Sequence, residues 1–195
     1  MLLIFLDIET TGLDPDKHRI LEIAYRIVES TTNHSIVSYL STIQQPLEVW
    51  KQADPKSLQI NGFTWEDSLK GKSEKVVGSE ILNDLNRVKL GESEGVFICQ
   101  NPSFDRAFFI QLINTDLQYH YKWPYHWLDL ASMYWAIQLK NNPEFPNQIK
   151  EIDLSKNKIA GYYGIPEEDS PHRAMNGVDH LIACYQAIFN KNLGC

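Results

Sequence analysis

Hydrophobic residues in the first quarter of the chain follow the patterns of β-strands. Residues 2–6 (Leu-Leu-Ile-Phe-Leu) form a continuous apolar run, which is typical of a central strand buried on both faces. From residue 19 to residue 28 the apolar positions follow a period of two, which places on one face Leu21, Ile23, Tyr25 and Ile27. Residues 29–35 are polar and indicate a turn, and residues 36–43 form a third strand candidate. The chain is therefore expected to open with a meander of three strands.

Beyond Pro46 the apolar residues mostly recur every three or four positions, which indicates helices. The first clear stripe consists of Val77, Ile81, Leu85 and Val88. A short apolar strand at residues 95–99 leads directly into a helix with one face made of Phe104, Phe108 and Leu112. Further helices are predicted at residues 127–139 and 154–163, and the last helix carries Val178, Leu181, Ile182, Tyr185 and Phe189. This order of elements predicts an α/β fold in which helices flank a mixed sheet.

Length and composition limit the class of protein. The chain has 195 residues, of which 43% are hydrophobic and 22% charged, which fits a single domain over residues 1–195 with its own core. Three cysteines are too few for a disulfide framework, and no apolar stretch is long enough for a membrane span or a signal peptide, so a soluble cytoplasmic protein without membrane contact is expected. The net charge of −7 excludes binding of polyanions by bulk positive charge.

A pair of acids closes the first predicted strand. Asp7 and Glu9 are two residues apart, so their side chains point to the same face while Ile8 points to the other. Two neighbouring carboxylates at the end of a buried strand repel each other, and the five residues on either side include no basic one. A hard divalent cation such as Mg²⁺ would relieve this repulsion, although an isolated pair of this kind also fits the solvated end of a strand.

Asp105 is a second candidate, because it follows the second apolar strand and borders the buried stripe of the next helix. It could join the pair on the first strand, or it could be an ordinary acid of a first helical turn.

Three segments resemble the motifs of the DnaQ-like exonucleases of the DEDDh type. They are Asp-Ile-Glu-Thr-Thr-Gly-Leu at residues 7–13, Asn-Pro-Ser-Phe-Asp at residues 101–105 and His-Arg-Ala at residues 172–174, in the order of that family. Residues 19–24, 60–64, 127–130 and 162–165 are also similar to family segments, so the resemblance covers nearly the whole chain. It implies a ribonuclease H-like fold, with parallel strands after the three-strand meander.

The resemblance also implies an activity, namely hydrolysis of phosphodiester bonds at single-stranded DNA or RNA 3′ ends with release of nucleoside 5′-monophosphates. Carboxylates would hold two Mg²⁺ or Mn²⁺ ions. Asp7 would bind both ions, Glu9 the ion on the side of the attacking water, and Asp105 the other ion. His172 would be the general base, because imidazole titrates close to working pH.

The same resemblance assigns residues to the substrate. The terminal nucleotide would contact Thr10, Thr11, Gly12 and Leu13, where Gly12 allows close approach of the backbone and Leu13 could wedge against a base. Phe104 would lie near the metal-binding acid, and Phe63 and Trp65 fall near a segment that borders the nucleotide, although core packing explains these aromatic residues as well. The implied partners are nucleic-acid ends, with a homodimer or a polymerase as further candidates.

The third motif departs from the family pattern. The family has its fourth acid five residues after the histidine, and here that position is Gly177. If the helix keeps its register, Gly177 replaces the acid and Asp179 points to another side of the helix. If the turn after His172 is longer, Asp179 could reach the metal ions as the fourth ligand, and this second account is the one favoured from sequence. Asp169 is a more remote substitute.

The missing acid leaves a competing function open. The protein could be a catalytically weak module with a nuclease fold that binds nucleic-acid ends or a polymerase. A phosphoesterase acting on small nucleotides is a third hypothesis, which the first motif disfavours because its loop resembles one that holds a polymer end.

Overall fold

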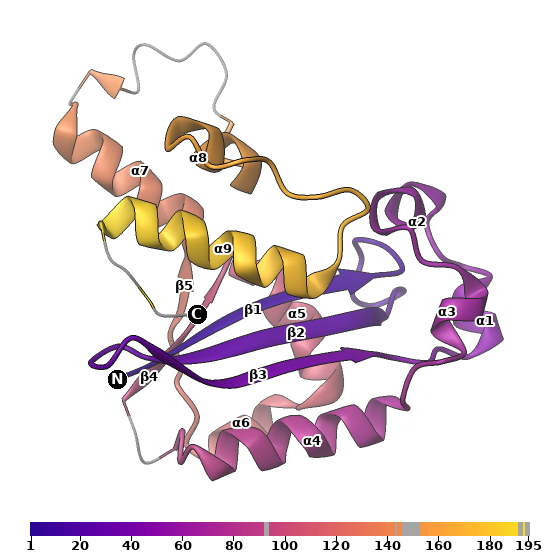
Figure 1. Ribbon diagram of the computed structural model, residues 1–195. Helices are drawn as coiled ribbons and strands as arrows, with labels where there is room; N and C mark the ends of the chain where they lie inside the picture. Colours follow the sequence, from indigo (N-terminus) through magenta and orange to yellow (C-terminus); the bar gives the residue numbers. More distant parts are fainter. Residues whose placement is uncertain (92–93, 143, 146–152, 191–192, 194–195) are drawn as a thin grey trace.

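The computed structural model describes residues 1–91, 94–142, 144–145, 153–190 and 193. Within these ranges, five strands form one mixed sheet in the order β3-β2-β1-β4-β5 (Figure 1). The strands are β1 (Leu2–Thr10), β2 (Ile20–Glu29), β3 (His34–Thr42), β4 (Gly95–Cys99) and β5 (Trp127–Asp129). β1, β2 and β3 pair antiparallel, whereas β4 pairs parallel with both β1 and β5. The predicted meander followed by parallel strands is therefore confirmed.

Helices cover both faces of the sheet and one of its ends. They are α1 (Leu47–Trp50), α2 (Pro55–Asn61), α3 (Trp65–Ser68), α4 (Glu74–Arg87), α5 (Pro102–Leu112), α6 (Thr115–His120), α7 (Leu130–Asn141), α8 (Lys156–Tyr162) and α9 (Ala174–Phe189). Figure 1 shows α4 and α6 on one side of the sheet and α7, α8 and α9 on the other. None of the helices in the described ranges combines the length and the hydrophobicity that crossing a lipid bilayer requires.

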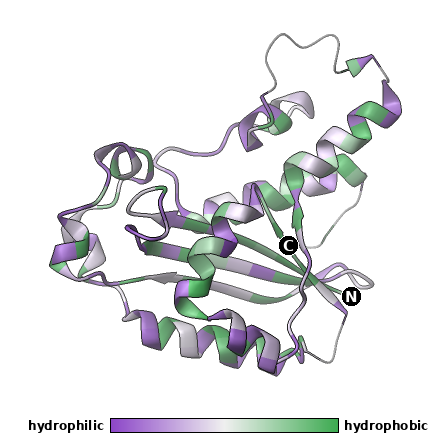
Figure 2. Cartoon of the chain, turned by 180° about the vertical axis from the view of Figure 1, so that it is seen from behind, coloured by the Kyte–Doolittle hydropathy of each residue, from purple (hydrophilic) through white to green (hydrophobic). Residues whose placement is uncertain are grey.

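Strand β1 separates two hydrophobic cores. Leu2, Ile4, Leu6 and Ile8 pack into one core with residues of α4 and α5, and Leu3 and Phe5 pack into the other with residues of α8 and α9. Figure 2 shows the resulting concentration of hydrophobic residues along the central strands. Because side chains alternate along a strand, Asp7 and Glu9 continue the row of Leu3 and Phe5 and face the α8–α9 side.

One predicted helix begins as a strand. Residues 127–139 were expected to be helical throughout, but Trp127–Asp129 pairs with β4 and only the remainder belongs to α7. The Trp127 ring stacks on Phe97 with 4.2 Å between ring centroids, which favours the extended conformation. The Asp129 side chain then accepts hydrogen bonds from the backbone N–H groups of Ala131 and Ser132, so the helix can begin only after it.

Candidate active site

The carboxyl end of β1 carries the first two predicted site residues. Asp7 lies opposite Ala24 of β2 and Glu9 lies opposite Glu22, and both acids are partly buried. Ile8 between them is buried in the core on the other face of the sheet. In Figure 1 this end of β1 points toward α2 and the beginning of α9. The strand therefore presents both carboxylates to the elements that carry the third motif.

Asp105 approaches from the parallel neighbour of β1. Strand β4 ends at Cys99, and Asn101 turns the chain with a φ of 60° before Pro102 begins α5. The Asn101 N–H donates to Asp129 Oδ1 at 3.0 Å, which fixes this turn. Asp105 lies in the first turn of α5 and is 2% exposed. The sequence predicted it at the border of the apolar stripe, and it is more deeply buried than that position implies. Because parallel strands end at the same edge, Asp105 arrives beside Asp7 and Glu9.

The segment before α9 brings in His172. Its backbone N–H donates to the Ile60 carbonyl of α2 at 3.0 Å. The preceding Pro171 packs so closely on Gly62 that a Cβ at Gly62 would lie 2.7 Å from the Pro171 Cβ. Gly62 also has a φ of 67°, a conformation that favours glycine. The position of His172 is thus set by contact with the end of α2.

Glu22 holds the other side of this segment. It is buried, its carboxylate forms an ion pair with Arg173, and it accepts a hydrogen bond of 2.8 Å from the Ala174 N–H at the start of α9. The Arg173 guanidinium also lies over the Phe63 ring, 4.3 Å from its centroid. Phe63 is therefore a core and positioning residue in this structure, because it is 4% exposed and covered by Arg173.

We expect Glu22→Ala to destabilise the fold. The substitution removes the acceptor of a helix N-terminus and of a partly exposed guanidinium, so we expect a loss of about 1–3 kcal/mol in the free energy of unfolding. For a chain of this size that corresponds to roughly 2–4 °C in Tm for each kcal/mol. Urea denaturation of both proteins measures the difference. Asp179→Ala serves as a control, since it breaks a half-exposed ion pair and should cost about 1 kcal/mol or less.

A pocket of about 290 Å³ gathers the predicted catalytic residues. Its lining includes Asp7, Glu9, Asp105, Phe104 and His172, and further consists of Ile8, Gln100, Ser155, Lys156, Asn157 and Glu168. Three of the predicted metal ligands, the predicted base and one predicted substrate contact are thus brought together from β1, α5 and the segment before α9. The sequence prediction did not include Gln100, Lys156 and Glu168, which no family motif marks.

The predicted nucleotide-binding loop continues from β1 beside this pocket. Thr10 and Thr11 are buried, and the Asn61 side chain donates to the Thr10 carbonyl at 3.0 Å. A Cβ at Gly12 would lie 2.4 Å from the His18 ring, so any larger residue at this position would force the ring to move. Leu13 is 71% exposed and available for contact with a ligand.

Asp179 does not lie with the other acids. It projects from α9 toward β2, where its two carboxylate oxygens accept hydrogen bonds of 2.6 Å and 3.1 Å from Arg26. Gly177 instead faces Asp7, because a Cβ at Gly177 would lie 1.7 Å from Asp7 Oδ2. The helix therefore keeps its register, and Gly177 stands where the family has its fourth acid. The sequence had favoured a longer turn that would bring Asp179 to the metal ions, and the structure does not have that turn. Asp169 is exposed and lies outside the pocket lining.

Burial and mutual repulsion disfavour the charged form of the three clustered acids. Burial raises the pKa of Asp7 to about 6, with Lys156 opposing the shift and Glu168 adding to it. Burial, together with the charges of Asp7 and Glu168, raises the pKa of Glu9 to about 8. Burial and the Asp7 charge hold the pKa of Asp105 well above its usual range. Such a group of acids is typical of a site that binds a cation.

Lys156 is the cation of this pocket in the described structure. Its Nζ lies 2.9 Å from Glu168 Oε2 and 3.8 Å from Asp7 Oδ2, and it donates to the Gly177 carbonyl at 3.2 Å. Burial opposes its charge, but Asp7 and Glu168 outweigh this effect and raise its pKa. The ammonium therefore stays charged and partly neutralises the acids around it.

The chemistry of the lining fits a divalent metal ion. Four carboxylates and two side-chain amides offer oxygen ligands, and two buried oxygens, Gln100 Oε1 and Glu168 Oε1, have no hydrogen-bond donor among the described residues. As the described side chains stand, no three Asp, Glu, His or Cys residues converge closely enough to enclose an ion. Binding therefore requires the carboxylates to turn inward, which the repulsion between them opposes until a cation enters.

The raised pKa values predict how the stability of the metal-free protein depends on pH. Glu9 binds its proton more tightly when folded, with a pKa of about 8 against 4.5 for the free side chain. The folded state thus holds more protons between these values, so stability should fall as pH rises from 4.5 to 8, by up to about 1.4 kcal/mol per pH unit for one group. Thermal melts between pH 5 and 8 with a chelator measure this slope. An unchanged slope in Glu9→Gln would contradict the assignment.

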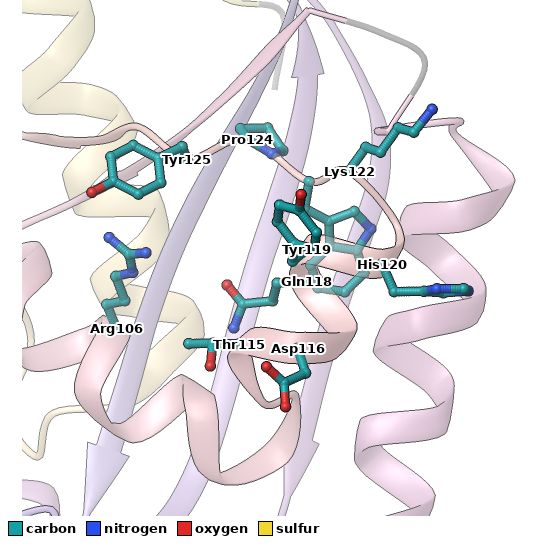
Figure 3. A pocket seen from close by; sticks show the side chains of 10 residues that line it. Arg106, Thr115, Asp116, Gln118, Tyr119, His120, Lys122, Pro124 and Tyr125 are labelled. Carbon is teal, nitrogen blue, oxygen red and sulfur yellow. The ribbon is translucent and has the colours of Figure 1, made fainter.

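A larger cavity, of about 1120 Å³, opens between α5, α6 and the segment before β5 (Figure 3). Arg106 lies over the rings of Tyr125 and Trp127, at 5.4 Å and 5.9 Å from their centroids. None of the residues predicted for catalysis is among the described residues that line this cavity. Its size alone therefore does not make it the place of hydrolysis.

Comparisons with known proteins show the family and the fold of this chain. The exonuclease family model matches residues 4–185. E. coli exonuclease I in complex with a 5cy-dA13 oligonucleotide has a TM-score of 0.75 and 18% sequence identity over 98% of this chain and 41% of that chain. The zinc ion bound form of the E. coli exonuclease I–ssDNA complex has a TM-score of 0.73 and 18% identity, over 97% of this chain and 40% of that chain. A product-bound structure of exonuclease I has a TM-score of 0.72 and 16% sequence identity, over 97% of this chain and 43% of that chain.

The structural likeness shows a shared ribonuclease H-like fold, and this chain spans about two fifths of the length of those proteins. A search of curated protein sequences finds no match. The family model is the stronger finding, because it covers most of the chain and includes all three motifs. The protein belongs to the DnaQ-like exonuclease family.

Proposed function

We propose that the protein is a metal-dependent 3′–5′ exonuclease that removes nucleoside 5′-monophosphates from single-stranded DNA or RNA ends. The observation that carries this proposal is the pocket in which Asp7, Glu9, Asp105 and His172 meet. The solved relatives were bound to oligonucleotides and single-stranded DNA, which supports a nucleic-acid substrate. A partner polymerase, a second copy of the chain and a cytoplasmic location belong to the same proposal as expectations.

The cofactors in this proposal are two Mg²⁺ or Mn²⁺ ions held by Asp7, Glu9 and Asp105. Bound there, they would lower the pKa of an attacking water and stabilise the charge on the leaving oxygen. The three carboxylates would bind and orient the ions. Asp7 and Glu9 are partly buried and Asp105 is fully buried, which limits access of bulk water to the reacting phosphate. With two divalent ions bound, the local negative charge would be offset, so the net charge of −7 would not prevent binding of a short single-stranded end.

His172 and the loop after β1 complete the proposed chemistry. His172 is partly exposed and lines the same pocket as the acids, so its imidazole can take a proton from a water held there. Thr10, Thr11, Gly12 and Leu13 would receive the terminal nucleotide, with the exposed Leu13 side chain against its base. Phe104 at the pocket wall offers a second apolar surface.

Digestion of labelled oligonucleotides tests the proposal. Single strands labelled at the 5′ end should shorten stepwise in the presence of Mg²⁺ or Mn²⁺, and Glu9→Ala should stop the reaction. A DNA oligonucleotide, a long RNA and a very short RNA, digested side by side, identify the preferred substrate. The proposal is wrong if Glu9→Ala still shortens the oligonucleotides, or if the wild type does not shorten them.

The second candidate is a catalytically weak module that binds nucleic-acid ends or a polymerase. It is favoured by one observation, the glycine at position 177 with the Lys156 ammonium beside it. Calorimetric titration with Mn²⁺ separates the two functions. Two tight sites argue for the enzyme, and the absence of tight binding argues for the module.

A further inference from the structure

The side of the pocket next to α9 has no room for an acid at the family position. A Cβ at Gly177 would lie 1.7 Å from Asp7 Oδ2, a separation that forces one of the two to move. It would also lie 3.1 Å from Lys156 Nζ. Asp7 and Lys156 therefore fill the space into which an acid at position 177 would extend. Any fourth carboxylate of this site would therefore come from another element.

Glu168 is the carboxylate that reaches the pocket from the segment between α8 and α9. Its side chain is 4% exposed, whereas the neighbouring residues Glu167 and Asp169 are exposed. The backbone N–H of Glu168 donates to Asn157 Oδ1 at 2.9 Å, which ties the segment to α8 at this residue. A buried carboxylate needs compensation for the loss of its hydration. The position of Glu168 is thus built into the fold and is not that of a surface acid.

Only one of the two Glu168 oxygens is compensated by the described residues. Oε2 pairs with Lys156 Nζ at 2.9 Å, whereas Oε1 is buried and has no donor in the described part of the chain. Glu168 lines the same pocket as Asp7, Glu9 and Asp105. An uncompensated buried oxygen at the wall of an acidic pocket is what a cation would satisfy.

Lys156 connects this acid to the first motif. Its side chain is 11% exposed, and its Nζ lies between Glu168 Oε2 and Asp7 Oδ2, at 2.9 Å and 3.8 Å. It also donates to the carbonyl of Gly177. One ammonium thus holds Glu168 beside Asp7, in the space into which an acid at position 177 would extend. A divalent ion bound by Asp7 and Glu168 would compete with this ammonium for the same oxygens.

We propose that Glu168 supplies the fourth carboxylate of the metal site in place of the acid absent at Gly177, with Lys156 as the counter-cation that holds it beside Asp7 until a divalent ion binds. The inference rests on the proposed function, because it concerns the same ions. It differs from the family pattern in the element that provides the ligand, which is the segment before the histidine instead of the helix after it.

Titration of the full chain with Mn²⁺ tests the inference directly. Calorimetry counts the bound ions, and electron paramagnetic resonance of free Mn²⁺ gives the count independently of enzyme activity. We expect two ions for the wild type, and for Glu168→Gln the loss of one ion or at least a tenfold weaker second site. Glu167→Gln is the matched control, because its side chain is exposed one residue earlier, and it should leave both sites unchanged.

Lys156→Gln tests the second half of the inference. Since a competing cation is removed, Mn²⁺ should bind several times more tightly than in the wild type. If the Lys156–Glu168 pair is merely structural, Lys156→Gln should weaken Mn²⁺ binding or leave it unchanged, and Glu168→Gln should keep both ions. Either result overturns the inference, and so does a wild type that binds no Mn²⁺. Circular dichroism and thermal melts of each variant confirm that it is folded.

The oligonucleotide assay separates failure of the inference from failure of the proposed function. If the wild type digests oligonucleotides and Glu168→Gln still binds two ions, the proposed function stands and Glu168 is not a ligand. If the wild type binds two ions but digests no oligonucleotide, and Glu168→Gln binds one ion, Glu168 is a ligand and the proposed nuclease activity is wrong.

Discussion

Asp105→Asn is expected to lower the rate of oligonucleotide hydrolysis by a factor on the order of 10²–10³, because the change removes a charge that would act on the transition state. Asparagine has nearly the shape of aspartate, so the fold should accommodate it at a position that is 2% exposed. The loss of activity should then reflect the chemistry of the site and not a collapse of α5.

The same substitution should stabilise the metal-free protein. Burial and the nearby Asp7 charge hold the pKa of Asp105 well above its usual range, so at neutral pH this group favours unfolding. That penalty is absent below the pKa of the unfolded side chain and grows as pH rises toward the folded value. Asparagine removes it, and a gain of about 1 kcal/mol or more at neutral pH is expected. Residues that cost stability and serve chemistry are typical of active sites.

Thermal melts in a chelator and rate measurements with Mg²⁺ test both halves of this prediction on the same preparations. Asp116→Asn is the control, because Asp116 is an exposed acid in the first turn of α6, and it should change neither the rate nor, beyond about 0.5 kcal/mol, the stability. An Asp105→Asn variant that is less stable and fully active would show that the acid is structural.

The sheet meander and the long helices could be predicted from the sequence because their burial pattern is simple. Strand β1 is buried on both faces and reads as an unbroken apolar run, and α4 buries one stripe that includes Val77, Ile81 and Leu85. Strand β5 could not be predicted in this way. It has three residues, and its conformation depends on pairing with β4 and on the Trp127–Phe97 stack, contacts that lie outside any local window.

Some residues of the candidate site could likewise be predicted from local sequence, and others could not. Asp7 and Glu9 were predicted because their two-residue spacing on a strand fixes a common face, and the motif order pointed to Asp105 and His172. Lys156 and Glu168 belong to no motif. Lys156 reaches the pocket from the first turn of α8, and Glu168 reaches it from the segment between α8 and α9. The sequence shows that an acid is missing at Gly177. It does not show that the side chains of Asp7 and Lys156 occupy the space beside this glycine.

Gly177→Ala should therefore act on Asp7. The added methyl group would lie 1.7 Å from Asp7 Oδ2, so the Asp7 carboxylate must rotate away or α9 must shift outward. Either movement displaces the acid that is proposed to bind both ions, and we expect hydrolysis to fall by a factor on the order of 10². The steric cost of the added methyl group should be about 1–3 kcal/mol, and the gain of about 1 kcal/mol in helix propensity of alanine over glycine should offset part of it.

Gly161→Ala provides the matched control for this substitution. Gly161 also lies in a helix, α8, and a Cβ there would meet nothing within 4 Å. This variant should show the gain in helix propensity, up to about 1 kcal/mol, without loss of activity. Activity and urea denaturation measured on both variants separate the effect of a methyl group on a helix from its effect on Asp7. Full activity in Gly177→Ala would mean that the Asp7 carboxylate works equally well in another orientation, and that the close contact with α9 does not position it for catalysis.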